Sequence, residues 1–341
     1  MYGNIGGMTF EVEFTFRRTN LKIMHQGLDA CNQVPRRLLF PEPSPTFDPV
    51  DDIPLVSFNP VNRDLNPEQQ LAVSSILSIA SSAERNQGPN PYIIYGPPGT
   101  GKTVTLVESI KQLIERYPDD RILVTAPSNE AADIFVSRLS AMPTSEMLRL
   151  NAFSRNERAV PRAVRDYSLE DDRGFVFPAN IDKIGQYKVV VATCATASRL
   201  WNMLNLPRGF FNTIVCDECG HAWEPEATAT VLNGLASDNT VIILAGDPKQ
   251  LGPIVRSTVA KDAGLATSWL ERLMGMPAYS KRGPGCADSS SAGGEEGAEA
   301  AGEEWRYDPM RVTKLLRNYR SHEAIIRLPN SMFYDNEVSI S

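Results

Sequence analysis

The sequence predicts an α/β protein with a doubly wound, mostly parallel sheet and helices on both faces. Five short runs predict strands, at residues 92–95, 121–126, 189–193, 213–216 and 241–245. The last three are apolar without alternation, which is typical of strands buried on both faces. Helical patterns follow the first two runs, and strands that alternate with helices indicate parallel pairing. A glycine-rich loop joins the first run to the helix after it.

Upstream of these runs, the pattern is less regular. Residues 10–16 alternate apolar and polar side chains and predict a strand, and residues 20–31 place apolar side chains at helical spacing. Residues 35–67 are rich in Pro and Asp, which favours an extended linker.

Three helices are expected around the first two strands. One runs from Pro67 to Ser82, because Asn66 suits the N-cap and proline suits the first helical position. The others cover about residues 102–116 and 129–140, each after an apolar run.

Composition is that of an ordinary globular chain, with 42% apolar and 22% charged residues among 341. The net charge of −7 argues against a generic basic nucleic-acid binder. However, residues 283–304 carry six acidic and no basic side chains, so the rest of the chain is nearly neutral and does not exclude a nucleic-acid partner. We expect residues 281–305 to form a disordered surface insertion, because the tract has little apolar surface to bury. A regulatory acidic segment is the alternative.

Cellular location is indicated by what the chain lacks and by its cysteines. No run approaches the roughly 18 apolar residues of a membrane span, and the first residues do not resemble a signal peptide. Five scattered cysteines suit a reducing compartment, and the one C-x-x-C (Cys216, Cys219) has no second pair at zinc-binding spacing. The expected address is the cytoplasm or nucleus, with no membrane partner.

The run GPPGTGKT matches the phosphate-binding pattern G-x-x-x-x-G-K-[ST] between a predicted strand and a predicted helix. Its glycines let backbone N–H groups turn toward phosphate oxygens, and the helix N-terminus adds positive potential. Lys102 would reach the β- and γ-phosphates and Thr103 would ligate Mg²⁺. A plain Gly-Pro turn is the alternative. The expected ATP-binding residues of this loop are Gly96, Pro97, Pro98, Gly99, Thr100, Gly101, Lys102 and Thr103.

Polar residues follow two other predicted strands. Asp217 comes after the run at 213–216 and would hold Mg²⁺ through water, while Glu218 would orient and deprotonate the attacking water. Gln250, in GDPKQLGP after the run at 241–245, would sense the γ-phosphate or that water. A Gly-Asp-Pro turn followed by surface residues is the alternative for this last segment.

Six segments in combination resemble superfamily 1 helicases of the up-frameshift-like group, and most of all the Armitage/Moloney-leukaemia-virus-ten-like branch of RNA-silencing helicases. They are LNPEQ (65–69), GPPGTGKT (96–103), APSNEAAD (126–133), DECGHA (217–222), GDPKQLGP (246–253) and LLRNYRSH (315–322). The resemblance covers about residues 10–341, apart from the acidic tract. It implies a RecA-like P-loop NTPase fold that uses ATP and Mg²⁺.

The resemblance also implies roles at the nucleotide. Gln69 would read the adenine, Tyr319 would stack on it, and Arg320 would contact the γ-phosphate as a catalytic residue. An amphipathic surface is the alternative for Tyr319 and Arg320.

Four further residues resemble the family's contacts to the RNA backbone: Ser128, Asn129, Thr193 and Thr196. Hydroxyl and amide groups at helix starts suit phosphates without reading bases. Simple helix caps are the alternative.

The resemblance divides the chain into four parts. Residues 1–64 would be the remainder of an accessory barrel and stalk with a linker, 65–280 the first RecA-like domain, 281–305 the acidic insertion, and 306–341 an incomplete start of the second RecA-like domain. We expect a chain truncated within that domain to bind ATP but hydrolyse it poorly, because a second-domain arginine would be missing.

The expected function is that of an ATP-dependent RNA helicase, which moves 5′ to 3′ on single-stranded RNA in RNA silencing or mRNA turnover. Argonaute-type silencing proteins or mRNA-decay proteins are the expected partners, in the cytoplasm and its ribonucleoprotein granules. A non-catalytic adaptor that binds ATP and RNA, and a DNA helicase of the same superfamily, are the alternatives. A small-molecule P-loop kinase is disfavoured, because GDPKQLGP and LLRNYRSH have no evident role there.

Overall fold

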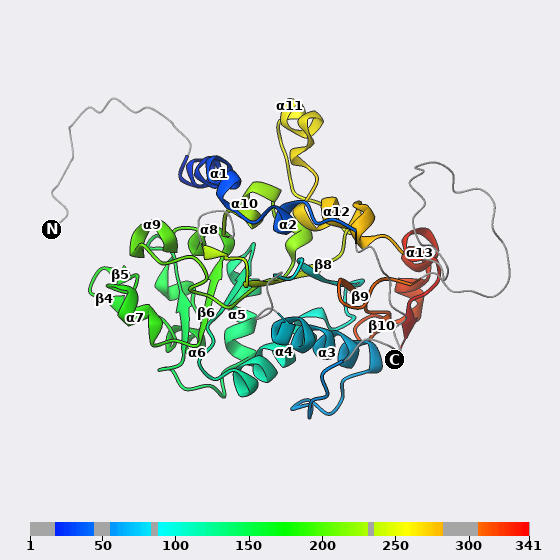
Figure 1. Cartoon of the computed structure of the whole chain (residues 1–341), viewed down its shortest axis with the longest axis horizontal. Helices are drawn as coiled ribbons and strands as arrows, with labels where there is room; N and C mark the ends of the chain where they lie inside the picture. Colours follow the sequence, from blue (N-terminus) through cyan, green and yellow to red (C-terminus); the bar gives the residue numbers. More distant parts are fainter. Residues whose placement is uncertain (1–17, 44–54, 83–87, 231–234, 282–305, 341) are drawn as a thin grey trace, which may run out of the picture.

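The computed structural model describes residues 18–43, 55–82, 88–230, 235–281 and 306–340 (Figure 1). The strand predicted at residues 10–16 and the acidic tract lie outside these ranges. Within them, a seven-stranded sheet organises the chain, with helices packed on both faces.

The central sheet has the strand order β3-β6-β2-β7-β8-β1-β9, and every neighbouring pair is parallel. This confirms the predicted doubly wound α/β fold and all five predicted strands. The sequence did not indicate β3 and β9, the two edge strands. The seven strands are β1 (Tyr92–Tyr95), β2 (Ile122–Ala126), β3 (Met147–Leu150), β6 (Val189–Thr193), β7 (Thr213–Cys216), β8 (Val241–Gly246) and β9 (Val312–Lys314).

Successive strand residues point to opposite faces, and each face has its own apolar core. Ile94 and Val124 belong to the first core, whereas Ile93 and Leu123 belong to the second, and all four are fully buried. Each such side chain contributes about 1.5–3 kcal/mol of burial free energy. The first face is covered by α3 (Pro67–Ser82), α4 (Lys102–Arg116) and α5 (Asn129–Arg138). The second is covered by α2 (Arg36–Leu39), α8 (Cys194–Ala197), α9 (Leu200–Leu204), α10 (Glu224–Thr230) and α12 (Trp269–Met274).

The helix predicted from Pro67 begins as expected, with Asn66 as its cap. Asn66 Oδ1 accepts the N–H of Gln69 at 2.8 Å, and Gln69 Oε1 accepts the N–H of Asn66 at 3.0 Å. This reciprocal cap satisfies two amide groups at the helix start. It also fixes Gln69, whose Nε2 donates to the carbonyl oxygen of Thr100 at 3.1 Å.

The interpretation of residues 35–67 as an extended linker is wrong for its first part. Residues 36–39 form α2, and Leu38 and Leu39 are buried in the second core. Val56 and Phe58 pack against the first core from further along the segment. The prolines favoured a linker in the sequence, although the apolar side chains of this segment pack against the sheet.

The C-terminal segment also belongs to the sheet. β9 pairs with β1 along Ile93–Tyr95, and Leu315 is buried in the first core. β9 thus lies in the first sheet although it follows the boundary predicted at residue 306, and the division into domains stays a prediction. As a result β1 is held between β8 and β9.

The remaining elements are short connections and flanking helices. α1 packs against α10, and α11 lies on a projection that follows β8 (Figure 1). No helix in the described ranges is long and apolar enough to cross a membrane. The remaining helices and strands, outside the seven-stranded sheet and the helices that cover it, are α1 (Thr19–Asp29), α6 (Arg162–Arg165), β4 (Glu170–Asp171), β5 (Gly174–Phe175), α7 (Ile181–Gly185), α11 (Thr258–Ala260), β10 (Arg317–Asn318), α13 (Glu323–Phe333) and β11 (Ser339–Ile340).

Candidate functional site

The phosphate loop connects β1 to α4 and depends on two glycines. Gly99 and Gly101 have φ of +83° and +87°, in the left-handed region that favours glycine. A Cβ at Gly99 would lie 2.7 Å from the Cβ of Arg320, and one at Gly101 would lie 2.4 Å from Nε2 of Gln69. These positions leave no room for a side chain, so the backbone can close around a small anion.

Lys102 begins α4 and is buried inside this loop. Its ammonium donates to the carbonyl oxygens of Gly96 at 2.7 Å and Pro97 at 3.3 Å. The hydroxyl of Thr100 donates to the same Pro97 carbonyl at 2.9 Å. Because these partners are neutral, the buried positive charge favours an anionic ligand.

Thr103 and Asp217 meet at the carboxyl end of β7. The Thr103 hydroxyl donates to Asp217 Oδ2 at 2.8 Å, and the N–H of Glu218 donates to Asp217 Oδ1 at 2.9 Å. Burial, followed by the charge of Glu218, raises the pKa of Asp217 to about 6. A hydroxyl and a carboxylate oxygen side by side are donors that Mg²⁺ prefers, so these residues fit the expected metal.

Glu218 leaves β7 in a left-handed conformation, with φ of 51°. Such strain in a residue other than glycine is typical of functional sites. The contact of its carboxylate with the His221 ring, 3.4 Å away, lowers the pKa of Glu218, and the charges of Lys102 and Arg320 add to this against the opposite effect of burial. The same contact raises the pKa of His221. Glu218 is therefore ionised, as a general base must be.

Gln250 belongs to a hydrogen-bonded group at the end of β8 that the sequence did not reveal. Asp247 Oδ2 accepts from Gln250 Nε2 at 2.9 Å and from the Tyr334 hydroxyl at 2.7 Å. Because Tyr334 follows α13, one buried carboxylate ties Gln250 to the C-terminal segment. The position of Asp247 directly after a buried strand was the signal available in the sequence.

Residues around Tyr319 close the other end of the loop. The Tyr319 hydroxyl accepts from Asn66 Nδ2 at 2.9 Å across 253 positions of sequence, and its N–H donates to the carbonyl oxygen of Gly99 at 3.0 Å. Asn318 Nδ2 donates to the carbonyl oxygen of Pro98 at 2.6 Å. The segments LNPEQ and LLRNYRSH are thus both fastened to the phosphate loop.

A cavity of about 670 Å³ lies along these residues, within the roughly 300–1,000 Å³ of small-molecule sites. The predicted residues in its wall are Gln69, Pro98, Gly99, Gly101, Lys102, Thr103, Glu218, Gln250, Tyr319 and Arg320. The wall also contains four residues that were not predicted: Asn62, Asp64, Val104 and Arg138. Four other predicted residues support the wall through the hydrogen bonds described above: Gly96, Pro97, Thr100 and Asp217. This arrangement fits ATP with Mg²⁺.

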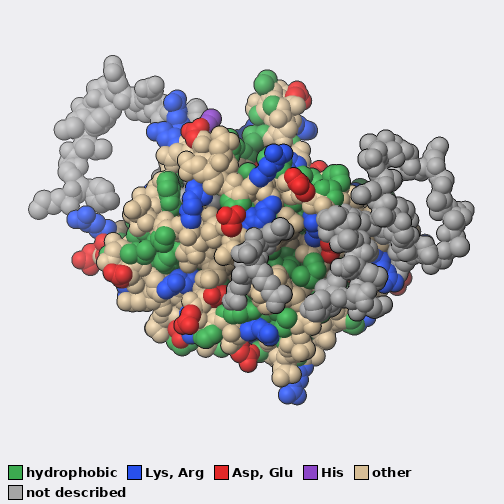
Figure 2. Space-filling model, viewed as in Figure 1, with side chains coloured by type: hydrophobic (Ala, Val, Ile, Leu, Met, Phe, Trp, Pro, Cys, Tyr) green, Lys and Arg blue, Asp and Glu red, His purple; other side chains and the backbone are tan. Residues whose placement is uncertain are grey.

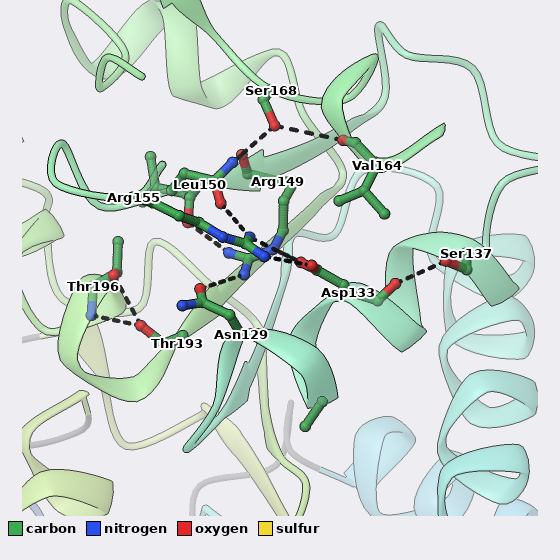
Figure 3. Close-up of polar contacts among 12 residues, drawn as sticks. Asn129, Asp133, Ser137, Arg149, Leu150, Arg155, Val164, Ser168, Thr193 and Thr196 are labelled. Atoms are coloured by element: carbon green, nitrogen blue, oxygen red, sulfur yellow. Dashed lines mark hydrogen bonds and ion pairs between the residues drawn. The ribbon is translucent and has the colours of Figure 1, made fainter. Parts of the chain in front are cut away.

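The residues predicted to contact RNA lie at the carboxyl ends of β2 and β6. Ala126, the last residue of β2, is paired with Thr193, the last residue of β6, so Ser128 and Thr193 lie at neighbouring strand ends. Ser128 Oγ accepts the N–H of Ala131 at 3.1 Å. Thr193 Oγ1 accepts the N–H of Thr196 at 3.3 Å and donates to the Thr196 hydroxyl at 2.9 Å (Figure 3). These contacts cap helices, as the alternative interpretation expected, and the role in RNA binding stays a prediction.

Asn129 belongs to a buried ionic cluster that the sequence did not reveal (Figure 3). Arg149, on β3, donates from Nε to Asp133 Oδ1 at 2.8 Å and from Nη2 to Asn129 Oδ1 at 3.0 Å. Arg155 donates from Nη2 to Asp133 Oδ2 at 2.6 Å. Burial alone would raise the pKa of Asp133, but the hydrogen bonds and charges of the two arginines lower it. Two guanidinium groups share one carboxylate, so the cluster carries net positive charge.

Comparisons with known proteins agree with this site. The sequence profile of the AAA domain family matches residues 64–173 and 180–258. The mov-10-B.1 protein of Danio rerio is 39% identical over 98% of this chain and 30% of its own length. RNA helicase Mov10l1 of Mus musculus is 41% identical over 83% of this chain and 21% of its own length. The probable RNA helicase armi of Drosophila melanogaster is 31% identical over 97% of this chain and 28% of its own length.

The chain spans less than a third of the length of each of these relatives. The matched ranges nevertheless contain the phosphate loop, Asp217, Glu218 and Gln250, which the structure gathers at one end of the sheet. The chain therefore belongs to the AAA domain family, in the superfamily 1 helicase branch that contains Mov10l1 and armi.

Proposed function

We propose that this chain is the ATP-binding part of an RNA helicase that couples ATP hydrolysis to 5′ to 3′ movement on single-stranded RNA. The observation that carries the proposal is the one cavity in which the phosphate loop, Glu218, Gln250 and Arg320 meet. RNA as the track is supported by the names of Mov10l1 and armi, both RNA helicases.

Nucleotide binding in this proposal uses the loop and the ends of two strands. Lys102 exchanges its carbonyl partners for β- and γ-phosphate oxygens. Thr103 and Asp217 hold Mg²⁺, which neutralises charge on the phosphates during transfer. Gln69 recognises the adenine and the exposed ring of Tyr319 stacks on it.

Hydrolysis uses the opposite wall of the cavity. Glu218 orients the attacking water and accepts its proton, and the lowered pKa of Glu218 keeps this base ionised at neutral pH. Gln250 positions the water or the γ-phosphate. Arg320 stabilises the negative charge of the transition state, a role for which arginine is suited in phosphoryl transfer.

The RNA is proposed to run along the carboxyl ends of β2 and β6, past Ser128, Asn129, Thr193 and Thr196. Contacts of this kind hold the backbone without reading sequence. On the face shown in Figure 2, Lys and Arg side chains are scattered among acidic ones rather than gathered into one stripe. Affinity would then depend on local groups at the strand ends.

The test is Glu218→Gln, which removes the base but keeps the size of the side chain. Turnover of Mg-ATP with U-rich single-stranded RNA is expected to fall about 10²–10⁴-fold, the usual contribution of a positioned base. The Kd for ATP should stay the same, because Glu218 does not bind the nucleotide in this scheme. Equal turnover of variant and wild type would overturn the assignment.

Two alternatives have distinct outcomes in the same assays. An adaptor would bind ATP and RNA with no turnover, and Glu218→Gln would change nothing. A DNA helicase would bind single-stranded DNA more tightly than RNA of the same sequence at one fixed salt concentration.

We also propose a role in RNA silencing or mRNA turnover, with Argonaute-type or mRNA-decay proteins as partners, in the cytoplasm and its ribonucleoprotein granules. The support is the similarity to armi and Mov10l1. Proximity labelling in cells, with the Lys102→Ala chain as the comparison, tests it. Labelling of nuclear proteins alone would contradict the proposed location.

A further inference from the structure

Three strand ends, and not two, meet at the edge where RNA is proposed to bind. Leu150, at the end of β3, is paired with Ala192 of β6, so the chain leaves β3 beside Thr193. The segment that follows carries Phe153, whose side chain is 47% exposed. An aromatic ring is thus placed next to the predicted backbone contacts.

Phe153 is held by a second ring and a cation. The ring centroids of Phe153 and Phe177 are 4.8 Å apart. The guanidinium of Arg199 lies 5.5 Å from the Phe153 centroid and 5.7 Å from the Phe177 centroid. The N–H of Arg199 donates to the carbonyl oxygen of Thr196 at 3.2 Å, so this cation follows a predicted RNA contact by one helical turn.

Arg199 differs from the other arginines at this edge. Arg149 and Arg155 are paired with Asp133. In the described part of the chain, the Arg199 side chain has ring contacts but no ion pair and no hydrogen bond. A partly exposed guanidinium with five unused donors is well suited to a phosphate group.

We propose that Phe153, Phe177 and Arg199 form a platform for one nucleotide of single-stranded RNA. The base stacks on the exposed ring of Phe153, and Arg199 donates to the neighbouring phosphate. Phe177 packs against the second core and fixes the platform from below. This inference rests on the proposed function, and it adds a stacking site to a track otherwise made of backbone contacts.

Phe153→Ala tests the stacking. The Kd for U-rich single-stranded RNA, measured by fluorescence anisotropy, is expected to rise about tenfold, within the usual range for loss of one stacked base. The Kd for an abasic oligonucleotide of equal length should not change, because it has no base to stack. Phe153→Trp should keep wild-type affinity, whereas Phe153→Leu, which fills the space without a ring, should behave like Phe153→Ala.

The chain offers a matched control in Phe40. This ring is 52% exposed and also lies beneath an arginine, since the guanidinium of Arg272 is 5.0 Å from its centroid. It follows α2, on the second face of the sheet. Phe40→Ala should leave the Kd for both oligonucleotides unchanged.

Arg199→Ala tests the phosphate contact. It should weaken binding of both oligonucleotides and reduce the slope of log Kd against log salt by about 0.7, the value for one contact to a single strand. Arg199→Lys should keep most of that slope.

Three outcomes would overturn the platform but leave the proposed function in place. RNA affinity of Phe153→Ala equal to that of Phe40→Ala, or equal losses with the abasic strand, would remove the stacking role. An unchanged salt slope in Arg199→Ala would remove the phosphate contact. A wild-type chain that binds ATP but no single-stranded RNA would instead overturn the proposed function, and the platform with it.

Discussion

Two buried carboxylates at the same edge of the sheet are held in opposite ways. The part of this edge that carries the phosphate loop is called the nucleotide half. In it, Asp217 is buried beside Glu218, and its pKa rises to about 6. Asp133, in the half with β2, β6 and β3, is shared by Arg149 and Arg155, which lower its pKa. The nucleotide half thus keeps charges that favour a ligand, whereas in the other half the Asp133 carboxylate is already paired with two arginines.

The largest expected effect lies in the nucleotide half. Lys102→Ala removes the buried cation of the phosphate loop, and the Kd for a non-hydrolysable Mg-ATP analogue should rise about 100-fold, because a hydrogen bond to a charged group contributes roughly 1.5–3 kcal/mol. Isothermal titration calorimetry measures this Kd. Lys111→Ala, further along α4, is the control, and equal affinities of the two variants would contradict the role of Lys102.

The next effect lies in the other half. Asp133→Ala leaves Arg149 buried without its carboxylate and should lower the free energy of unfolding by about 2 kcal/mol. This is less than the ~3–5 kcal/mol typical of a broken buried pair, because the Asp133 and Arg155 side chains are still 12% and 11% exposed to water. Urea unfolding at neutral pH measures it, with Glu130→Ala on the exposed side of α5 as the control.

The difference in stability between wild type and Asp133→Ala should depend on pH. The pKa of Asp133 is lower in the folded chain, so its stabilisation is present above the unfolded pKa of about 4 and is lost as pH falls through the folded value. The gap between wild type and Asp133→Ala should therefore shrink in acid. A gap that stays constant would show that the ion pairs do not cause it.

The effect of Asp217→Asn on stability should have the opposite sign to that of Asp133→Ala. The pKa of Asp217, about 6 in the folded chain, is above its unfolded value. Stability from this group is present below about pH 4 and is lost as pH rises through 6. Without nucleotide, Asp217→Asn should stabilise the chain by about 1 kcal/mol above pH 6. Its amide oxygen can still accept the N–H of Glu218, but its NH2 group cannot accept the Thr103 hydroxyl as Asp217 Oδ2 does, so part of the gain is lost. Thermal unfolding across pH checks this against Asp262→Asn, and a destabilised Asp217→Asn would contradict it.

The smallest predicted effect distinguishes a capping role of Ser128 from a contact with RNA. Ser128→Ala should cost about 1 kcal/mol of stability through the lost cap, and so should Ser257→Ala, whose hydroxyl accepts the N–H of Ala260 at 3.2 Å. Only Ser128→Ala should also weaken RNA binding, by about fivefold for one lost hydrogen bond. RNA affinity that is equal in the two variants assigns Ser128 to capping alone.

The nucleotide half could be predicted from sequence because its residues stand in contiguous segments whose chemistry is specific. GPPGTGKT, Asp217 with Glu218, and the Asn66 cap each indicate their own geometry. In the structure, Lys102, Thr103 and Glu218 line one cavity. Asp217 and Asn66 are hydrogen-bonded to wall residues, to Thr103 and Gln69 respectively. The contact of Tyr319 with Asn66 could not be derived from either segment, because it depends on the path of the chain between them.

The other half resisted prediction for identifiable reasons. Arg149 places a charge in the middle of MLRL, which hid β3, and its partner Asp133 lies 16 positions away on another element. β9 has three residues, too few for a pattern. The leucines of α2 stand next to prolines, whose signal for a linker was stronger. In each case tertiary packing, rather than local preference, decides the structure.

β1 lies between two strands that come much later in the sequence, and this determines when during synthesis the nucleotide site can form. β1 pairs with residues 243–246 and 312–314, so its neighbours are synthesised long after it. At ~5–20 residues per second, the last neighbour follows β1 by ~10–40 s, and such non-local parallel pairing is also intrinsically slow. The nucleotide site therefore matures near the end of synthesis of this segment, and a nascent chain that already displays GPPGTGKT does not yet have the sheet that holds it.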